Sequence, residues 1–209
     1  MPLLKIHPLG EHQAWGLWHM QETEEALSFE SIESCPLEII HHQKRLEWLT
    51  GRVLIKSLLE NLGLLYHGIK KDEFGKPYLN QNPHHISLSH SYPYVVAQID
   101  RNNSVGIDLE QPKEKLKNIA HRIFNKTETD DAGNNLIKLC IYWCAKESLY
   151  KIYGKKNLQF IKNLLVSPFT LSESGALEGK IKLEGSETLV ALQYLVMKEY
   201  VMVYTDTTK

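Results

Sequence analysis

The sequence predicts an α+β fold built from two similar-sized lobes. Each half of the 209-residue chain contains both helical and extended patterns. A long amphipathic pattern over about residues 41–65 predicts a helix in the first half, and residues 136–153 carry its counterpart in the second. Alternating apolar and polar residues in the segments around these helices predict strands. A chain of this length can bury enough apolar surface for a substantial core.

The N-terminal half begins with an expected strand and its return. The helix over about 41–65 follows from apolar residues that recur every three or four positions, and Gly63 is a candidate for its end. Gly75 and Pro77 predict a loop after this helix. The residues that carry the helical spacing are Leu46, Leu49, Val53, Leu54, Leu58 and Leu62.

Short strands are expected over residues 85–89, 94–99 and 104–110. Helices should follow over about 118–124 and 136–153, the second of them ended by Gly154. Between these helices, glycine and asparagine in the segment 130–135 predict a loop. From residue 159 onward the pattern indicates a meander of extended segments, in which K-I-K-L-E alternates with period two.

Composition excludes several classes of protein. The chain has 24 Lys and Arg against 25 Asp and Glu, so its formal net charge of −1 argues against a non-specific nucleic-acid binder. Charged residues interrupt every apolar stretch before the ~18 residues of a membrane span. The first residues lack the pattern of a signal peptide, and three cysteines do not make a disulfide framework. We therefore expect a cytoplasmic protein without membrane or nucleic-acid partners.

The segment Val105-Gly106-Ile107-Asp108-Leu109-Glu110 alternates regularly. In a strand its apolar side chains point to one face, whereas Asp108 and Glu110 share the other face at a spacing of roughly 7 Å. Two carboxylates at this separation suit Mg²⁺, which combines one or two carboxylates with phosphate and water. The alternative interpretation is that these acids form the solvated face of a sheet.

A helical segment supplies further charged groups. In Trp143-Cys144-Ala145-Lys146-Glu147-Ser148-Leu149-Tyr150-Lys151, the spacing brings Trp143, Glu147 and Lys151 near one helix face. Glu147 is a candidate third metal ligand or general base. Lys151 is suited to neutralise a phosphate during transfer. The alternative is an ordinary i,i+4 ion pair on the helix surface.

These motifs together resemble the 4′-phosphopantetheinyl transferase superfamily, specifically its two-lobed type that activates surfactin synthetase (Sfp-type). VGIDLE and WCAKESLYK carry the resemblance, and LTGRVLIKSLL, FGKPYL and ISLSHS agree in order and spacing over about residues 41–153. The resemblance implies two similar α/β lobes related by a pseudo-twofold axis, with the active site between them. Residues 1–104 would form the lobe for the coenzyme A nucleotide, and 105–209 the lobe with the metal-binding acids and the catalytic helix.

The resemblance also implies an activity of the holo-[acyl-carrier-protein] synthase type. Such an enzyme moves the 4′-phosphopantetheine group of coenzyme A to a serine of an apo acyl or peptidyl carrier protein, and adenosine 3′,5′-bisphosphate leaves. The reaction would depend on Mg²⁺, for which Mn²⁺ could substitute. A monomer is expected, because a two-lobed chain supplies both halves of its own cleft.

The family's functional residues map onto this chain position by position. Asp108, Glu110 and Glu147 would hold the Mg²⁺, and Glu147 and Lys151 would be the catalytic groups. The residues expected to bind coenzyme A are Arg52, Lys76, Ser89, His90, Lys146 and Lys151.

Two other functions are compatible with parts of this pattern. A non-catalytic module that binds coenzyme A or a carrier protein would keep the binding residues without turnover. An Mg²⁺-dependent nuclease or phosphodiesterase would use the same acids and lysine. The near-neutral charge and the absence of a basic stripe argue against the nuclease.

Overall fold

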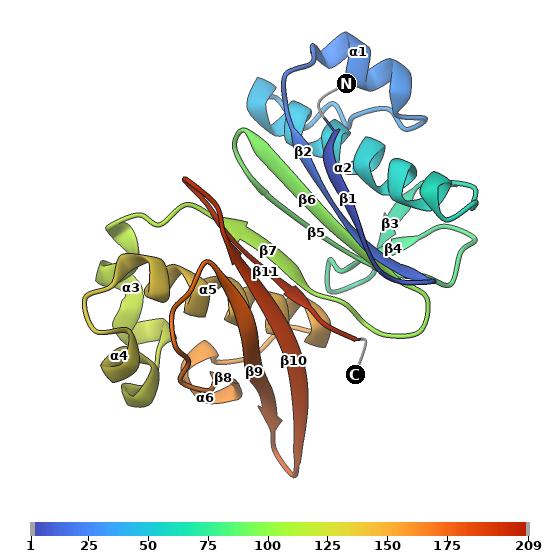
Figure 1. The fold of residues 1–209 in the computed structure, drawn as a ribbon. Coiled ribbons are helices and arrows are strands. Elements are labelled where there is room, and N and C mark those ends of the chain that lie inside the picture. Colours follow the sequence, from blue (N-terminus) through green and yellow to red (C-terminus); the bar gives the residue numbers. More distant parts are fainter. Residues whose placement is uncertain (1–2, 208–209) are drawn as a thin grey trace. The chain divides into compact units, whose positions relative to one another are not determined.

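The computed structural model describes residues 3–207 and divides the chain into two compact units, Met1–Val105 (unit 1) and Gly106–Lys209 (unit 2) (Figure 1). Both units combine helices with antiparallel sheets, which confirms the predicted α+β class. The division falls one residue beyond the expected lobe boundary of 104. Residues 1, 2, 208 and 209, at the ends of the two expected lobes, lie outside the described part of the chain.

Unit 1 is built on a four-stranded antiparallel sheet with the order β1-β2-β6-β5. Its strands are β1 (Leu3–Gly10), β2 (Gln13–His19), β5 (His85–Ser91) and β6 (Tyr94–Asp100). The pairing of β1 with β2 is the expected strand and its return. A separate two-stranded ribbon, β3 (Ile69–Lys71) and β4 (Pro77–Leu79), follows the long helix in sequence.

Helix α2 (His42–Asn61) packs against this sheet, and the short helix α1 (Glu24–Glu30) packs against α2 (Figure 1). The predicted apolar face of α2 is the buried one: Leu49, Leu54 and Leu58 are all fully inaccessible to solvent. The helix ends at Asn61, directly before Leu62 and Gly63, close to the expected end. The core of unit 1 therefore lies between α2 and the sheet.

Unit 2 is built on a five-stranded antiparallel sheet with the order β7-β11-β10-β9-β8. Its strands are β7 (Ile107–Glu110), β8 (Leu164–Val166), β9 (Ser174–Leu183), β10 (Ser186–Val196) and β11 (Val201–Thr205). Helix α5 (Leu136–Tyr153) packs across the sheet, as Figure 1 shows, and Gly154 ends it in a left-handed conformation. The predicted meander after residue 159 corresponds to β8, β9, β10 and β11, preceded by the short helix α6 (Phe160–Asn163).

Two shorter helices precede α5, and one of them corrects the sequence prediction. Helix α3 (Lys115–Ile123) covers the predicted helix, but α4 (Lys126–Ala132) occupies the first part of the predicted loop at 130–135. Helix α4 forms because Asn125 and Glu128 make a reciprocal capping box at its N-terminus. Gly133, at positive φ, is the C-cap residue, so only the last three of the six predicted loop residues lie outside the helix.

A buried ion pair connects the helices of unit 2. The Nζ atom of Lys146 lies 2.7 Å from Oε2 of Glu128, and neither side chain is accessible to solvent. Lys146 also donates to the carbonyl oxygens of Ile123 and Phe160. Glu128 accepts from the backbone amides of Asn125 and of Val166 in β8. The pair therefore joins α3, α4, α5, α6 and β8.

Two expectations from composition concern membranes and cysteines. Within residues 3–207, every helix is too short or too polar to cross a bilayer. Cys35, Cys140 and Cys144 are buried free thiols.

Replacing Lys146 by methionine should destabilise the protein strongly. The substitution leaves the Glu128 carboxylate buried without its counter-charge, which costs about 3–5 kcal/mol of unfolding free energy. Urea denaturation of the purified variant measures this loss.

The matched double variant, Lys146→Met with Glu128→Gln, tests the electrostatic origin of that loss. The new amide side chain carries no charge and retains one oxygen for one of the two backbone amides that Glu128 accepts from, so the double variant should be more stable than the single one. Equal losses in the two variants would show that shape, and not the unpaired charge, causes the effect.

Candidate functional site

The chemistry-bearing residues of unit 2 lie where strand β7 meets helix α5. Gly106 permits this contact, because a Cβ atom at that position would lie 2.1 Å from the carbonyl oxygen of Ser148. That distance is far below any real contact, and the obstructing atom belongs to the backbone of α5. The glycine of the V-G-I-D-L-E motif therefore lets the helix turn that carries Glu147 pack directly against the start of β7.

Asp108 is a buried carboxylate with a lysine partner. Only 4% of the residue is exposed, which rules out a solvated sheet face for this side chain. Lys151 places its Nζ 2.8 Å from Oδ1 of Asp108 and donates to the carbonyl oxygen of Ile107 at 2.7 Å. The ion pair of Lys151 thus joins α5 to β7, instead of joining Lys151 to Glu147 along the helix surface.

Glu147 is an acid whose pKa is strongly raised. Its pKa is raised from the usual 4.5 to about 7, mainly by burial and also by the negative charges of Asp108 and Glu110, while Lys151 acts to lower it. These electrostatic effects require all three charged groups to be close to Glu147. A carboxyl group with a pKa near neutrality is suited to accept a proton at physiological pH.

The three predicted metal ligands fit a divalent cation by donor type and by charge. Asp108, Glu110 and Glu147 supply only carboxylate oxygens, the ligands that Mg²⁺ prefers, and their mutual repulsion would be relieved by a cation. Within residues 3–207 no three His, Cys, Asp or Glu side chains are already gathered around one point. Here the Lys151 ammonium is the positive charge beside Asp108, so cation binding would require the carboxylates to turn toward the ion.

Lys146 corrects one prediction from sequence. It is expected among the coenzyme-binding groups, but its side chain is fully buried in unit 2. Its ammonium is already committed to Glu128 and to two backbone carbonyl groups. With no exposed donor left for a ligand, Lys146 has a structural role here.

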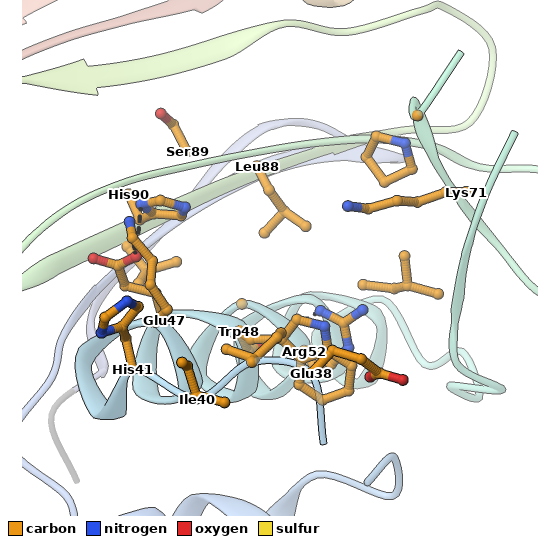
Figure 2. A pocket seen from close by; sticks show the side chains of 17 residues that line it. Glu38, Ile40, His41, Glu47, Trp48, Arg52, Lys71, Leu88, Ser89 and His90 are labelled. Atoms are coloured by element: carbon orange, nitrogen blue, oxygen red, sulfur yellow. Dashed lines mark hydrogen bonds and ion pairs between the residues drawn. The ribbon is translucent and has the colours of Figure 1, made fainter. Parts of the chain in front are cut away.

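Unit 1 contains a separate cavity of about 510 Å³. Helix α2, strand β5 and the β3–β4 ribbon contribute to its walls (Figure 2). Three of the four residues predicted in unit 1 to bind coenzyme A, namely Arg52, Ser89 and His90, line this cavity. The structure therefore brings together residues that are up to 38 positions apart in the sequence (52 to 90).

Successive side chains of strand β5 point to opposite faces of the strand. Leu88 and His90 point toward α2 across the cavity, whereas Ser89 points to the opposite face of the strand (Figure 2). Across from them, the Arg52 guanidinium lies over the ring of Trp48, 3.2 Å from its centroid, with Nε 3.5 Å from Oε1 of Glu33. His90 and Arg52 are thus held on facing walls.

Lys76 lies next to this cavity without lining it. The predicted turn is present: Gly75 adopts a positive φ, and both neighbours of Lys76, Gly75 and Pro77, line the cavity. The Lys76 ammonium, however, donates to Oγ of Ser104 at 2.7 Å, and burial lowers its pKa. In this arrangement the structure does not bring Lys76 together with Arg52 and His90.

Sequence reasoning missed several charged and aromatic residues of the cavity. Lys44, Glu47, Trp48 and Lys71 line it, and Lys71 points into it from β3 (Figure 2). A signal was available for three of them, because positions 44, 47, 48 and Arg52 follow three- and four-residue spacing on one helix face. Lys71 comes from a three-residue strand, which carries too little pattern to be recognised.

Replacing Gly106 by alanine should push α5 away from β7. Overpacking of this kind costs roughly 3 kcal/mol or more, because a backbone oxygen and not a flexible side chain obstructs the new methyl group. Urea denaturation provides the measurement. Gly10→Ala is the matched control, since nothing lies within 4 Å of a Cβ at that position, and its stability should change little. An unchanged stability of the Gly106 variant would contradict the close approach.

The raised pKa of Glu147 predicts a pH-dependent contribution to stability. Because the folded state favours the protonated carboxyl, this contribution is complete below pH 4.5 and is lost as the pH rises through about 7. The change from 4.5 to about 7 corresponds to about 3 kcal/mol at most. Glu147→Gln should therefore gain stability relative to the natural chain between pH 5 and about pH 8.

Urea unfolding of both chains at several pH values tests this. A constant difference across that window would show that Glu147 titrates normally. Added Mg²⁺ should reduce the difference, because a bound cation stabilises the charged carboxylate.

Comparison with known proteins supports the resemblance seen in the motifs. The family model of the 4′-phosphopantetheinyl transferase superfamily matches residues 104–205. The 4′-phosphopantetheinyl transferase Sfp of Bacillus subtilis (strain 168) is 31% identical over 150 residues, 65% of this chain. The 4′-phosphopantetheinyl transferase AcpT of Salmonella typhi is 27% identical over 139 residues, 63% of this chain and 70% of that protein.

The matched region spans only part of these relatives. The chain spans 65% of the length of Sfp, and 61% of a second Bacillus subtilis 4′-phosphopantetheinyl transferase that is 32% identical over 139 residues. The family match falls almost entirely in unit 2, which holds Asp108, Glu110, Glu147 and Lys151. The resemblance is confirmed: this chain is similar to the 4′-phosphopantetheinyl transferase superfamily, and to its Sfp type.

Proposed function

We propose that this protein transfers the 4′-phosphopantetheine group of coenzyme A to a serine of an apo acyl or peptidyl carrier protein. The serine oxygen forms a bond to the β-phosphorus, the bond from that phosphorus to the bridging oxygen breaks, and adenosine 3′,5′-bisphosphate leaves. The proton of the serine hydroxyl passes to a base on the protein. This is an activity of the holo-[acyl-carrier-protein] synthase type.

The observation that carries the proposal is the set of charges where β7 meets α5. Phosphoryl-type transfer needs positioning and charge neutralisation more than covalent help from the protein. Glu147, with a pKa of about 7, is suited to take the proton of the serine. Lys151 carries the positive charge that would neutralise the transferring phosphate, and its bonds to Asp108 and to the Ile107 carbonyl orient its ammonium.

Mg²⁺ is part of the proposal. Asp108, Glu110 and Glu147 would hold it, because they offer three carboxylates in one strongly negative environment. When bound, the ion would supply positive charge to the pyrophosphate oxygens. Mn²⁺ has similar ligand preferences and is an expected substitute.

The cavity of unit 1 supports coenzyme A as the donor. Lys44 and Arg52 reach it from helix α2, and His90 from strand β5 on the facing wall. Trp48 adds an aromatic surface. Positive groups for phosphate and an aromatic ring are what a phosphorylated nucleotide requires. We assign this cavity to the 3′-phosphoadenosine part of coenzyme A.

Transfer should be lost when the charges of unit 2 are altered. Incubating an apo acyl carrier protein with coenzyme A, Mg²⁺ and this protein should add the mass of phosphopantetheine to the carrier, and EDTA should prevent it. Glu147→Gln should reduce the rate at least about 100-fold, since a general base contributes that much or more. Intact-mass spectrometry over time measures both effects.

Glu114→Gln is the matched control. It removes one carboxylate from unit 2, but that side chain is 73% exposed and pairs with Lys117 at the surface, so the rate should be unchanged. Full activity of Glu147→Gln would refute the role of Glu147. Binding of coenzyme A without transfer to acyl or peptidyl carriers would favour the non-catalytic module, and cleavage of DNA or RNA would favour the nuclease.

A further inference from the structure

A buried carboxylate lines the cavity of unit 1. Glu47 is only 4% exposed and lies on the face of α2 that faces the cavity, below His90 (Figure 2). A negative charge is unexpected in the wall of a cavity that would receive a phosphate, because the two anions repel each other. The motifs that point to the family give Glu47 no role.

The contacts of Glu47 explain how this charge is accommodated. Oε2 lies 2.5 Å from the Lys44 ammonium and 3.3 Å from Nδ1 of His90. Oε1 accepts a hydrogen bond of 2.8 Å from the Gln43 side-chain amide. Both oxygens are therefore engaged by protein groups, and neither is left to meet a ligand.

These contacts determine what His90 and Lys44 present to the cavity. With Nδ1 of His90 facing the carboxylate, Nε2 is the ring nitrogen on the side away from Glu47. The Lys44 side chain is 55% exposed, yet its ammonium is held at the cavity by the same oxygen. A lysine without such a partner would lose rotamer freedom on binding a ligand, and this cost weakens binding.

Arg52, two turns after Lys44 on the same wall of α2, shows this arrangement with different residues. Arg52 has Glu33 beside its Nε atom and Trp48 against its guanidinium plane. Glu33 is itself held by the Tyr66 hydroxyl and the Ile69 amide. Carboxylates thus orient cations at two separate places around the cavity, so the placement of Glu47 is not an isolated feature of one side chain.

We propose that Glu47 is a positioning residue for phosphate binding in this cavity: it holds His90 and Lys44 so that they face the ligand. The inference rests on the proposed function, because it takes the ligand to be the 3′-phosphorylated nucleotide of coenzyme A.

The proposal predicts an effect opposite to that expected from net charge. If only charge mattered, Glu47→Gln would remove a repulsive anion and tighten phosphate binding. If Glu47 positions the two cations, the same substitution should weaken binding of adenosine 3′,5′-bisphosphate about tenfold, as expected for losing a charge-assisted interaction. Isothermal titration calorimetry of the full chain with this nucleotide measures the change.

Glu38→Gln is the matched control. Glu38 also lines the cavity but is exposed, so its substitution removes the same charge from the same cavity without disturbing His90 or Lys44. Its affinity for the nucleotide should stay within about twofold of the natural chain or become slightly tighter. Weakening of both variants to the same degree would overturn the positioning role.

Two further measurements separate positioning from general structural damage. In a double-mutant cycle, His90→Gln should weaken binding much less in the Glu47→Gln background than in the natural chain, because Glu47 acts in part through His90. Nuclear magnetic resonance of the His90 ring nitrogens in the ligand-free protein should show a changed Nδ1 signal in Glu47→Gln. Additive effects and an unchanged ring signal would refute the proposal even in a fully folded variant.

The outcomes distinguish this proposal from the proposed function. If the natural chain does not bind adenosine 3′,5′-bisphosphate, both the assignment of the cavity and the role of Glu47 fail. If the natural chain binds the nucleotide and Glu47→Gln binds it equally or more tightly, the positioning role fails alone. If Glu47→Gln does not fold, Lys44→Gln provides the second variant, and an unchanged affinity there would remove Lys44 from the proposal.

Discussion

The burial of charge is the constraint on which both candidate sites depend. An isolated carboxylate or ammonium inside a protein costs several kcal/mol or more unless it has a partner of opposite charge or several hydrogen bonds. Unit 2 meets this requirement with the pairs Asp108–Lys151 and Glu128–Lys146. Each pair joins α5 to a different element, β7 or α4, so the same contacts that satisfy the charges also hold α5 against its neighbours.

Two adjacent residues of α5 show how the position of a charged residue on a helix determines its environment. Lys146 lies on the buried stripe of the helix and has a full set of partners. Glu147 lies about 100° further around the helix, where burial and the like charges of Asp108 and Glu110 outweigh the single favourable cation. The result is one structural ion pair and one acid with a pKa near neutrality. A stable core and a reactive carboxyl group are thus produced by neighbouring positions of one helix.

Sequence periodicity predicted the long elements because their burial is simple. Helices α2 and α5 each bury one continuous face, and the helix face of Glu147 and Lys151 followed from the same spacing. The interior position of Lys146 could also have been read, since Leu139, Tyr142, Lys146 and Leu149 recur at three- and four-residue spacing. The spacing did not lead to this prediction because lysine is rarely buried without a partner of opposite charge. The partner, Glu128, lies 18 positions away in the sequence.

Other features depend on contacts that a single segment does not reveal. Helix α4 was missed although Asn125 and Glu128 have the spacing of a capping box, because glycine and asparagine after Asp131 indicated a loop. The commitment of Lys76 to Ser104 joins residues 28 positions apart, and no local pattern predicts it. The cavity of unit 1 likewise exists only because β5 and the β3–β4 ribbon return to α2.

Carboxylate and cation pairs occur in both units, but the partner that would meet a ligand differs. In unit 1 the buried member is the carboxylate, and the cations it holds line the cavity: Glu47 is 4% exposed while the Lys44 side chain is 55% exposed. In unit 2 the proposed ligand-binding members are the carboxylates themselves, and Lys151 is the cation between them and a phosphate. A count of charges would treat the two arrangements alike. In both pairs the carboxylate is the more buried member, so the neighbours make the difference. Glu47 is surrounded by donor groups, whereas Asp108 lies close to the further carboxylates of Glu110 and Glu147, so the first arrangement suits an anion and the second suits a cation.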